Sequence, residues 1–234
     1  MRDHFHNKHI DAIDADLSDN YFKPVLLEAL EHSGKPRSVC DVGCGNGIFT
    51  GWIKDHAGCR LVGVDGSEYA LKKAKQLNFD ELHHIEDFSN DNLPFKDESF
   101  DFVINKDVLE HLLNPENLVH EIAHITRMLG VVLIHVPNHF PISGRLKLLF
   151  RNTIDPFLYF PDSRRWDFPH IRFFNQQDFL DLMLSSGLKP VFNLCHHFTS
   201  FQKIGRLMPT TVKKRISKQF PDSFAEGFAF LFQK

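Results

Sequence analysis

The stretch DVGCGNG, residues 41–47, decides the fold of this 234-residue chain. Residues 38–42, which overlap the start of this stretch, predict a short buried strand. The alternating glycines that follow cannot continue the strand. Apolar residues then recur at helical spacing and predict a helix: Ile48, Phe49, Trp52 and Ile53. A strand, a glycine loop and a helix in this order indicate a parallel α/β unit whose backbone N–H groups face a ligand.

Strands and helices continue to alternate on both sides of this unit. Further strands are predicted at residues 60–65, 82–86, 100–105, 131–136, 189–195 and 227–233. Helices are predicted at residues 21–30, 68–77, 115–129 and 175–186, with Ser67 and Asn175 as N-caps. This alternation predicts an α/β fold built on a parallel sheet.

Composition and length indicate one globular domain with additions. Hydrophobic residues make up 42% and charged residues 24% of the chain, which is the globular average. Residues 1–138 carry 13 basic and 23 acidic residues, whereas residues 139–234 carry 14 and 7, together with 16 of the 24 phenylalanines. We predict a single domain, 1–234, with an N-terminal extension at 1–20 and acceptor-site cap elements at 139–170 and 197–226.

Several functional classes lack support in the sequence. No apolar run reaches the ~20 residues of a membrane span, and the first residues lack the apolar core of a signal peptide, so a cytoplasmic location is expected. The four cysteines form no CxxC pair. The fifteen histidines show no metal-ligand spacing, and we predict no bound metal.

The glycine loop and the acids that follow it predict an adenosine pocket. A dinucleotide site favours a third glycine where Ile48 stands, and a Walker loop would need a Lys-Ser/Thr pair that is absent. Asp65 ends the next strand, where its carboxylate can accept both ribose hydroxyls. Asp87 and Phe88, after the following strand, suit the amino group and the face of adenine.

These motifs resemble the class I S-adenosylmethionine-dependent methyltransferases. Residues 39–47 are similar to the family's first motif, residues 64–65 to its second and Asp87 to its third. Residues 93–101 with 108–112 are similar to the fourth-motif region of the subgroup that methylates small molecules, which includes ubiquinone-biosynthesis and methionine-biosynthesis-W-like members.

The resemblance covers roughly residues 20–196 and extends to 228–232. It implies a Rossmann-like, mostly parallel seven-stranded sheet with an antiparallel last strand, helices on both faces and an inserted cap. The strand end at 136–138 and the run at 170–174 are also typical of the family. Residues 129–131 depart from it, since the usual Pro-Gly-Gly turn is shorter here.

The resemblance also implies S-adenosylmethionine as cofactor and assigns roles to individual residues. The methionine part would contact Asp41, Gly43, Cys44, Gly45 and Gly47, with Asn105 and Lys106 following the fourth strand. The ribose would contact Asp65, and the adenine would contact Gly66, Ser67, Asp87 and Phe88.

No fixed motif encodes the catalytic base. His111, past the fourth strand, is our candidate, with His139 and His170 as rivals and a structural role as the alternative for each. Cys44 is interpreted as a small packing residue instead of a nucleophile. Trp166 and Tyr159 either line an acceptor pocket or belong to the core of the cap.

We therefore expect methyl transfer to a small or lipid-like acceptor, at oxygen. The alternative is a non-catalytic S-adenosylmethionine-binding protein that regulates another enzyme, although no protein partner is predicted. A nucleic-acid acceptor is disfavoured, because residues 105–108 lack the Pro-Pro-aromatic clamp for a flipped base. The basic amphipathic segment 212–220 predicts either a solvated helix or contact with an anionic membrane surface.

Overall fold

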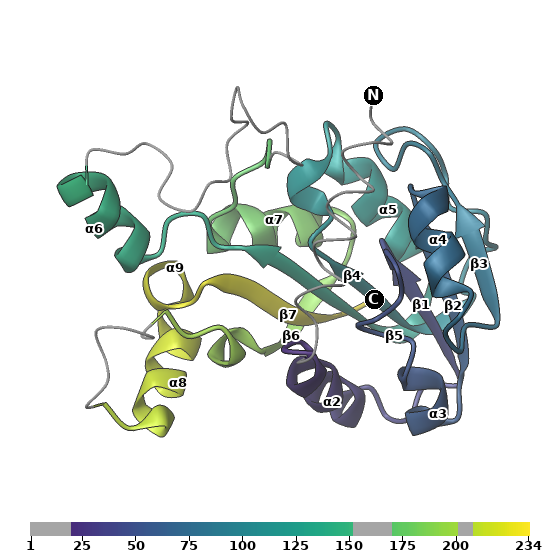
Figure 1. Ribbon diagram of the computed structural model, residues 1–234, viewed down its shortest axis with the longest axis horizontal. Coiled ribbons are helices and arrows are strands. Elements are labelled where there is room, and N and C mark those ends of the chain that lie inside the picture. Colours follow the sequence, from purple (N-terminus) through teal and green to yellow (C-terminus); the bar gives the residue numbers. More distant parts are fainter. Residues whose placement is uncertain (1–19, 152–169, 201–207) are drawn as a thin grey trace.

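A computed structural model describes residues 20–151, 170–200 and 208–234, which contain a seven-stranded sheet of order β3-β2-β1-β4-β5-β7-β6 (Figure 1). The strands are β1 Ser38–Val42, β2 Arg60–Asp65, β3 Glu81–His84, β4 Phe100–Lys106, β5 Thr126–Pro137, β6 Lys189–Asn193 and β7 Gly227–Gln233. Strands β1 to β5 pair in parallel, and β7 runs antiparallel to both β5 and β6. The predicted mostly parallel, Rossmann-like sheet with an antiparallel last strand is confirmed.

Helices and short 3₁₀ turns connect these strands. They are α2 Lys23–His32, α3 Ile53–Ala57, α4 Glu68–Ala74, η1 Leu109–His111, α5 Pro115–Ile125, α6 Ile142–Arg151, α7 Gln176–Ser185, η2 Cys195–His197, α8 Thr210–Gln219 and α9 Pro221–Phe224. Both predicted N-caps are confirmed: Ser67 Oγ accepts from the Ala70 N–H at 3.2 Å, and Asn175 Oδ1 accepts from the Asp178 N–H at 2.9 Å.

The sheet is covered on both faces because alternate residues of its strands point to opposite sides. On one face, Val132 of β5 and Phe228 of β7 share a buried cluster with α5 and α7. On the other face, Leu133 and Ala229, their sequence neighbours, share a cluster with α2 and the start of α3. Figure 1 shows these two helical layers above and below the strands.

Several segments differ from the sequence-based prediction: α4 ends at Ala74 instead of 77, β3 spans 81–84 instead of 82–86, and β6 ends at Asn193 instead of 195. Helix α5 ends at Ile125 instead of continuing to 129, because Thr126 takes extended angles (φ −78°, ψ 131°) and pairs with Phe100 at the start of β5. Between Gly47 and Trp52 the chain makes turns before α3 begins. There the Thr50 and Gly51 N–H groups both donate to the Gly47 carbonyl.

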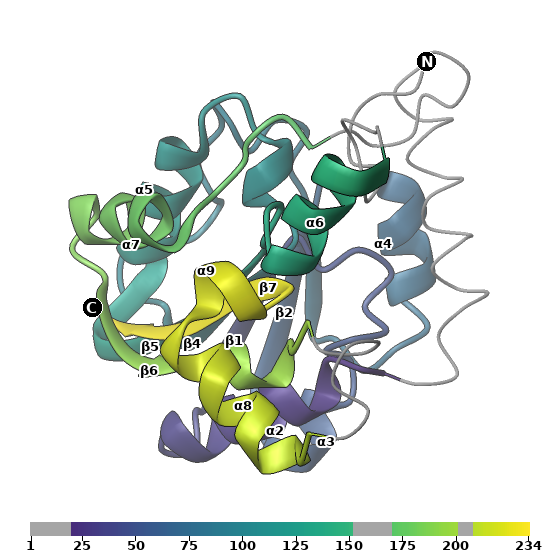
Figure 2. The same ribbon diagram turned by 90° about the vertical axis from the view of Figure 1, so that its left-hand side faces the viewer.

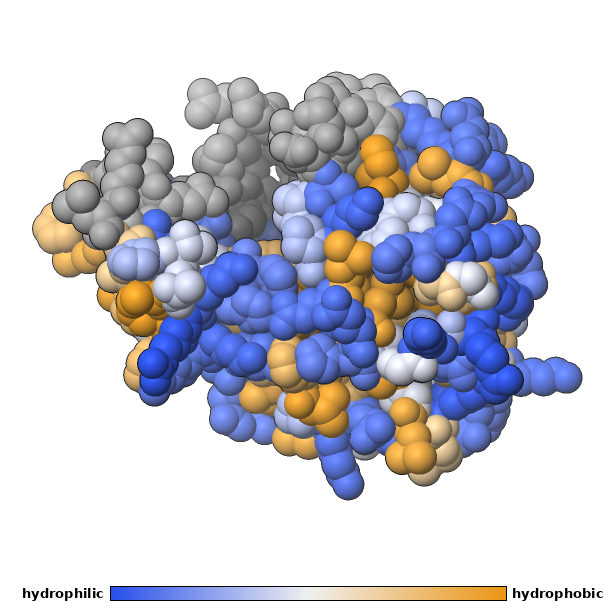
Figure 3. Space-filling model, turned by 90° about the horizontal axis from the view of Figure 1, so that it is seen from below, coloured by the Kyte–Doolittle hydropathy of each residue, from blue (hydrophilic) through white to orange (hydrophobic). Residues whose placement is uncertain are grey.

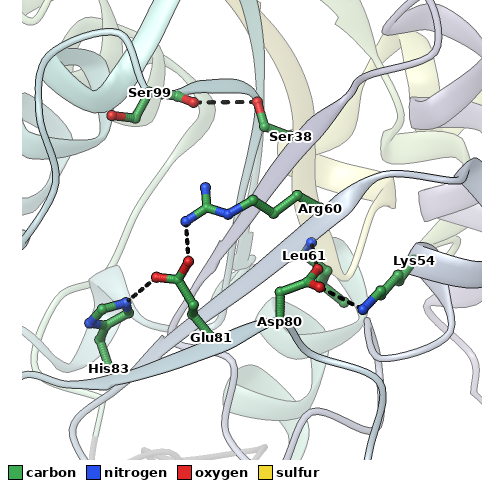
Figure 4. Close-up of polar contacts among 8 residues, drawn as sticks. All are labelled: Ser38, Lys54, Arg60, Leu61, Asp80, Glu81, His83 and Ser99. Atoms are coloured by element: carbon green, nitrogen blue, oxygen red, sulfur yellow. Dashed lines mark hydrogen bonds and ion pairs between the residues drawn. The ribbon is translucent and has the colours of Figure 1, made fainter.

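Polar contacts fasten the outer strands β2 and β3 to their surroundings (Figure 4). Arg60 pairs with Glu81 at 2.6 Å, and the same carboxylate lies 3.2 Å from His83. Asp80 accepts from the Leu61 N–H at 2.8 Å and pairs with Lys54 at 2.6 Å. These partly exposed pairs add little stability, but they set the register of an edge strand whose own side chains are poorly buried.

Helices α6, α9 and α8 lie together at one end of the molecule, the end that faces the viewer in Figure 2. They belong to the basic second part of the sequence. The underside of the molecule, shown in Figure 3, is mainly hydrophilic with separate hydrophobic patches. Within the described residues, no helix has both the length and the apolar composition required to cross a membrane.

The difference in burial between two phenylalanines predicts different losses of stability when each is replaced by alanine. Phe179 is fully buried against Phe228, Phe230 and Phe232, whereas Phe150 on α6 is 77% exposed. Phe179→Ala should lower the free energy of unfolding by about 3–5 kcal/mol, and Phe150→Ala by less than about 0.5 kcal/mol. Urea unfolding followed by circular dichroism measures both. Equal losses would contradict this assignment of the core.

Candidate functional site

The glycine loop crosses the ends of β1 and β2 at the carboxyl edge, by which we mean the edge of the sheet where β1 to β5 end. The N–H groups of Gly43 and Cys44 both donate to the Val64 carbonyl, at 2.7 and 3.0 Å. Gly43 has a φ of +85°, and a Cβ there would lie 2.2 Å from Val108 Cγ2. Only glycine fits this position, as the motif predicts.

Asp65 ties this loop to the start of α4. Its Oδ2 accepts from the Gly45 N–H at 2.7 Å, and its Oδ1 accepts from the Ser67 N–H at 2.8 Å. The carboxylate is buried, and Gly66 passes so close to β3 that a Cβ would lie 3.3 Å from the Ile85 carbonyl. The predicted ribose acid and its predicted neighbours therefore lie together.

Asp41 is buried beneath the loop, where Thr50 Oγ1 donates to it at 2.5 Å. Burial raises the pKa of this carboxyl to about 7, although the Thr50 hydrogen bond lowers it, and the nearby charge of Asp65 raises it further. Asp41 is therefore poised between its neutral and ionised forms near neutral pH.

The residues predicted to contact adenine follow β3 at the carboxyl edge. Asp87 shapes its own turn, since its carboxylate oxygens accept from the Ser89 N–H at 2.9 Å and from Asn90 Nδ2 at 2.8 Å. Phe88 is buried in the cluster that includes α5. The structure thus places the predicted adenine residues next to the strand that carries Asp65.

The end of β4 carries a buried amide and a partly buried ion pair. Asn105 is fully buried; its Nδ2 donates to the Val42 carbonyl at 2.8 Å, while its Oδ1 has no hydrogen-bond partner. Lys106 pairs with Asp107 and lies 4.4 Å from the centre of the Phe49 ring. Asp107 also contacts Nδ1 of the buried His135 at 2.6 Å.

Lys106 and Asp107 are both held in their charged forms although the pair is partly buried. Burial alone lowers the pKa of Lys106, but the charges of Asp107 and Tyr21 outweigh it and raise the pKa overall. Burial likewise raises the pKa of Asp107, but Lys106 and His135 outweigh it and lower that pKa. The predicted contact of Lys106 with the cofactor stays a prediction.

The three histidines proposed as rival bases form one cluster. His139 Nε2 lies 2.8 Å from His170 Nδ1, and the ring of His111 meets that of His170 edge to face, with 4.8 Å between ring centres. The segment at 170–172 is fastened to η1, because the Ile171 and Arg172 N–H groups donate to the Glu110 carbonyl at 2.8 and 3.0 Å. Arg172 also donates from Nε to the Leu112 carbonyl at 3.2 Å.

The sequence analysis did not identify Glu110 as a candidate site residue. It is fully buried, and neither carboxyl oxygen has a hydrogen-bond partner; His111 Nε2 lies 3.9 Å from its Oε1. Burial raises the pKa of this carboxyl well above its ordinary value. The available signal was one acidic residue inside the apolar run 108–112.

The thiol of Cys44 is buried, and burial raises its pKa, as expected for a packing residue. Its Sγ lies 2.8 Å from the position of a Cβ at Gly63, which shows how tightly the loop packs on β2. Trp166 and Tyr159 lie outside the described residues.

Comparisons with known proteins agree with this geometry. Residues 40–134 match the methyltransferase domain family. A probable S-adenosylmethionine-dependent methyltransferase of Mycolicibacterium smegmatis is 32% identical over 121 residues, 51% of this chain and 45% of the relative. Another from Mycobacterium tuberculosis is 26% identical over 190 residues, 76% of this chain and 59% of the relative. The chain thus spans about half the length of these relatives.

Solved structures show the same fold. A possible histamine N-methyltransferase of Thermotoga maritima superposes with a TM-score of 0.65 at 19% identity and covers all of both chains. Phosphoethanolamine N-methyltransferase 2 of Haemonchus contortus, solved with S-adenosyl-L-methionine, gives 0.62 at 18% identity over 97% of this chain and 57% of its own.

Taken with the strand order and the glycine loop, these findings identify a methyltransferase domain in residues 40–134, in a chain that has the class I methyltransferase fold. The cofactor of this class is S-adenosylmethionine. The narrower ubiquinone-biosynthesis and methionine-biosynthesis-W-like subgroup stays a prediction.

The loop geometry predicts different outcomes for two glycines of similar backbone angle. Gly43 and Gly34 both have positive φ, +85° and +71°, but a Cβ on Gly34 would meet nothing within 4 Å. Gly34→Ala should lower the free energy of unfolding by about 1–2 kcal/mol through backbone strain alone. Gly43→Ala should lose about 1–3 kcal/mol more and should also weaken S-adenosylhomocysteine binding. Calorimetric titration and urea unfolding test this; unchanged affinity in Gly43→Ala would contradict it.

Proposed function

We propose that this protein is an enzyme that transfers the methyl group of S-adenosylmethionine to a hydroxyl oxygen of a small or lipid-like acceptor. One observation carries the cofactor half of this proposal. The carboxylate of Asp65 holds the backbone of Gly45 and Ser67 at the carboxyl edge, where the ends of β1 and β2 meet. An acid in this position is suited to the ribose hydroxyls.

The methionine part of the cofactor would lie on the other side of the glycine loop. The buried Oδ1 of Asn105 lacks a partner, and it offers an acceptor for the methionine ammonium group. Asp41 would assist through water. These two groups belong to neighbouring strands, β4 and β1, which pair in register at this edge.

Transfer is an in-line attack of the acceptor oxygen on the sulfonium methyl group, so the enzyme must mainly orient the two molecules and activate the hydroxyl group. We assign activation to the histidine cluster, with His111 as the catalytic residue. Supporting this choice, His111 and His139 follow β4 and β5 at the carboxyl edge, and Asn105 lies near the end of β4.

The relatives do not agree on an acceptor. Their names include a sterol 24-C-methyltransferase of Schizosaccharomyces pombe and a tRNA (carboxymethyluridine(34)-5-O)-methyltransferase of Saccharomyces cerevisiae.

In our proposal, the basic second part of the chain selects the acceptor, with α6, α8 and α9 as cap elements. Exposed Leu149 and Phe150 on α6 and Val212 on α8 support an apolar acceptor or an anionic membrane surface nearby. The cytoplasmic location stays a prediction.

An acceptor panel tests the function. The purified protein is incubated with S-adenosylmethionine and phenols, acids, sugars or lipids, and S-adenosylhomocysteine formation is followed. Turnover with a hydroxyl acceptor supports the proposal. Tight cofactor binding without turnover on any member would favour the non-catalytic alternative.

Asp65→Ala tests the ribose assignment. It removes a carboxylate that would accept charge-assisted hydrogen bonds, so cofactor affinity should fall by about 10- to 100-fold. Asp97→Ala is the matched control, because the side chain of Asp97 is 80% exposed. Calorimetry with S-adenosylhomocysteine gives both affinities. Equal affinity in Asp65→Ala and the control would refute the assignment.

Cofactor binding should also depend on pH. The ionised form of Asp41 attracts the methionine ammonium group, and its pKa of about 7 means that acidification protonates it. Affinity should therefore fall by about tenfold between about pH 8 and about pH 6. Asp41→Asn should flatten this dependence. A variant with the full pH dependence of the wild type would show that another group is responsible.

A further inference from the structure

Among the residues that the structure describes, two groups of Glu and His side chains have ligand atoms close enough to hold a metal ion, within 4.8 Å of one another. One consists of Glu110, His111 and His170; the other, of Glu28, His196 and His197. The two groups have the same chemistry, one carboxylate and two imidazoles. They differ in whether the carboxylate is already satisfied, and that difference identifies the better candidate.

The Glu28 group is complete without an ion. Its Oε2 accepts from both rings, with distances of 3.1 Å to His196 Nε2 and 2.7 Å to His197 Nε2. The carboxylate is also partly exposed to solvent. An ion would have to displace existing hydrogen bonds here, because the Glu28 carboxylate is already satisfied by both imidazoles.

The Glu110 carboxyl group is the opposite case. It is fully buried, and both of its oxygens lack hydrogen-bond partners. A buried acceptor in this state is costly, by about 1–3 kcal/mol, and proteins rarely leave one unexplained. Because the nearest candidate donor, His111 Nε2, lies 3.9 Å away, the oxygens face imidazoles without bonding to them.

We propose that Glu110, His111 and His170 bind a divalent first-row transition-metal ion. Two imidazoles and one carboxylate are a recurrent ligand set for such ions, and they leave coordination positions open. Ligand atoms on a tetrahedral zinc ion lie about 3.4 Å apart, given bonds of about 2.0–2.1 Å. The 3.9 Å separation of Glu110 and His111 therefore needs only a small contraction.

The surroundings of His170 match those of a metal ligand. A ligating imidazole usually donates its second ring N–H to an acceptor, which fixes the ring. His170 Nδ1 lies 2.8 Å from His139 Nε2, so its Nε2 can face the ion while Nδ1–H donates to His139. The backbone bonds from residues 171 and 172 to the Glu110 carbonyl hold the two ligand segments together.

An ion here would take part in the activation that we assign to the histidine cluster, a role that rests on the proposed function. An acceptor hydroxyl bound at an open position would lose its proton to water more readily. The oxygen would then form its bond to the methyl carbon while the carbon–sulfur bond breaks and leaves its electron pair on sulfur. In this arrangement His111 and His170 would act on the hydroxyl group as ligands of the ion, and His111 would not itself accept the proton.

Metal binding to the full chain is the direct test and requires no acceptor. The chelator-treated protein is titrated calorimetrically with Zn²⁺ and, separately, with Mn²⁺. Wild type should show a binding event that Glu110→Gln weakens by more than about 100-fold, since loss of a ligand should exceed the 10–100-fold effect of a residue that only orients one. Glu28→Gln is the matched control and should retain the event.

Cobalt gives a second readout. Co²⁺ bound by imidazole and carboxylate ligands absorbs visible light, and this absorption should appear in wild type and Glu28→Gln but not in Glu110→Gln. S-adenosylhomocysteine binding verifies that each variant is folded; His170→Asn replaces Glu110→Gln if the latter does not fold.

Two results would overturn the site. One is an unchanged Zn²⁺ titration in Glu110→Gln or His170→Asn. The other is loss of the event in Glu28→Gln alone, which would place the ion at the other group. Cofactor binding and acceptor turnover are measured separately, so failure of metal binding leaves the proposed function to be judged by its own experiments.

Discussion

The hydrogen bonds from Gly45 and Ser67 to the carboxylate of Asp65 hold the candidate site together. A carboxylate that accepts two backbone N–H bonds out of water forms strong contacts, each contributing about 1.5–3 kcal/mol. One oxygen fixes the loop after β1 and the other fixes the turn into α4. Because both elements start from parallel neighbouring strands, this single side chain sets the shape of the carboxyl edge around the glycine loop.

Local patterns in the sequence were enough to predict most strands of the sheet. Strands 38–42, 60–65 and 227–233 and the caps Ser67 and Asn175 could be predicted because hydrophobic runs, glycines and capping residues act over a few positions. The extended start of β5 at Thr126 could not, since its reason is pairing with Phe100 in another strand. Helical spacing of apolar residues continues past that point, and tertiary pairing overrides it.

In the candidate site, too, features set by neighbouring residues could be predicted from the sequence, whereas contacts between distant segments could not. The positions of Asp65 and Asp87 at the carboxyl edge could be predicted because Asp65 ends a strand, Asp87 follows one, and strand ends meet at one edge of a parallel sheet. The cluster of His111, His139 and His170 could be named only as three rivals. Their meeting depends on backbone bonds between residues 171–172 and the Glu110 carbonyl, and nothing in the local pattern of either segment encodes that contact.

In the sequence, the ion pair of Lys106 and Asp107 lies between Asn105, which we assign to the methionine part of the cofactor, and Glu110. Their charges offset each other, and the ammonium group of Lys106 is covered by the rings of Tyr21, Phe22 and Phe49. Asp107 is further committed to His135, so its carboxylate is not available to the neighbouring cluster. Glu110 therefore keeps an unshared carboxyl group only three residues away. Because the ammonium group of Lys106 is already paired with Asp107, it does not donate to Glu110, and both carboxyl oxygens of Glu110 stay without a hydrogen-bond partner.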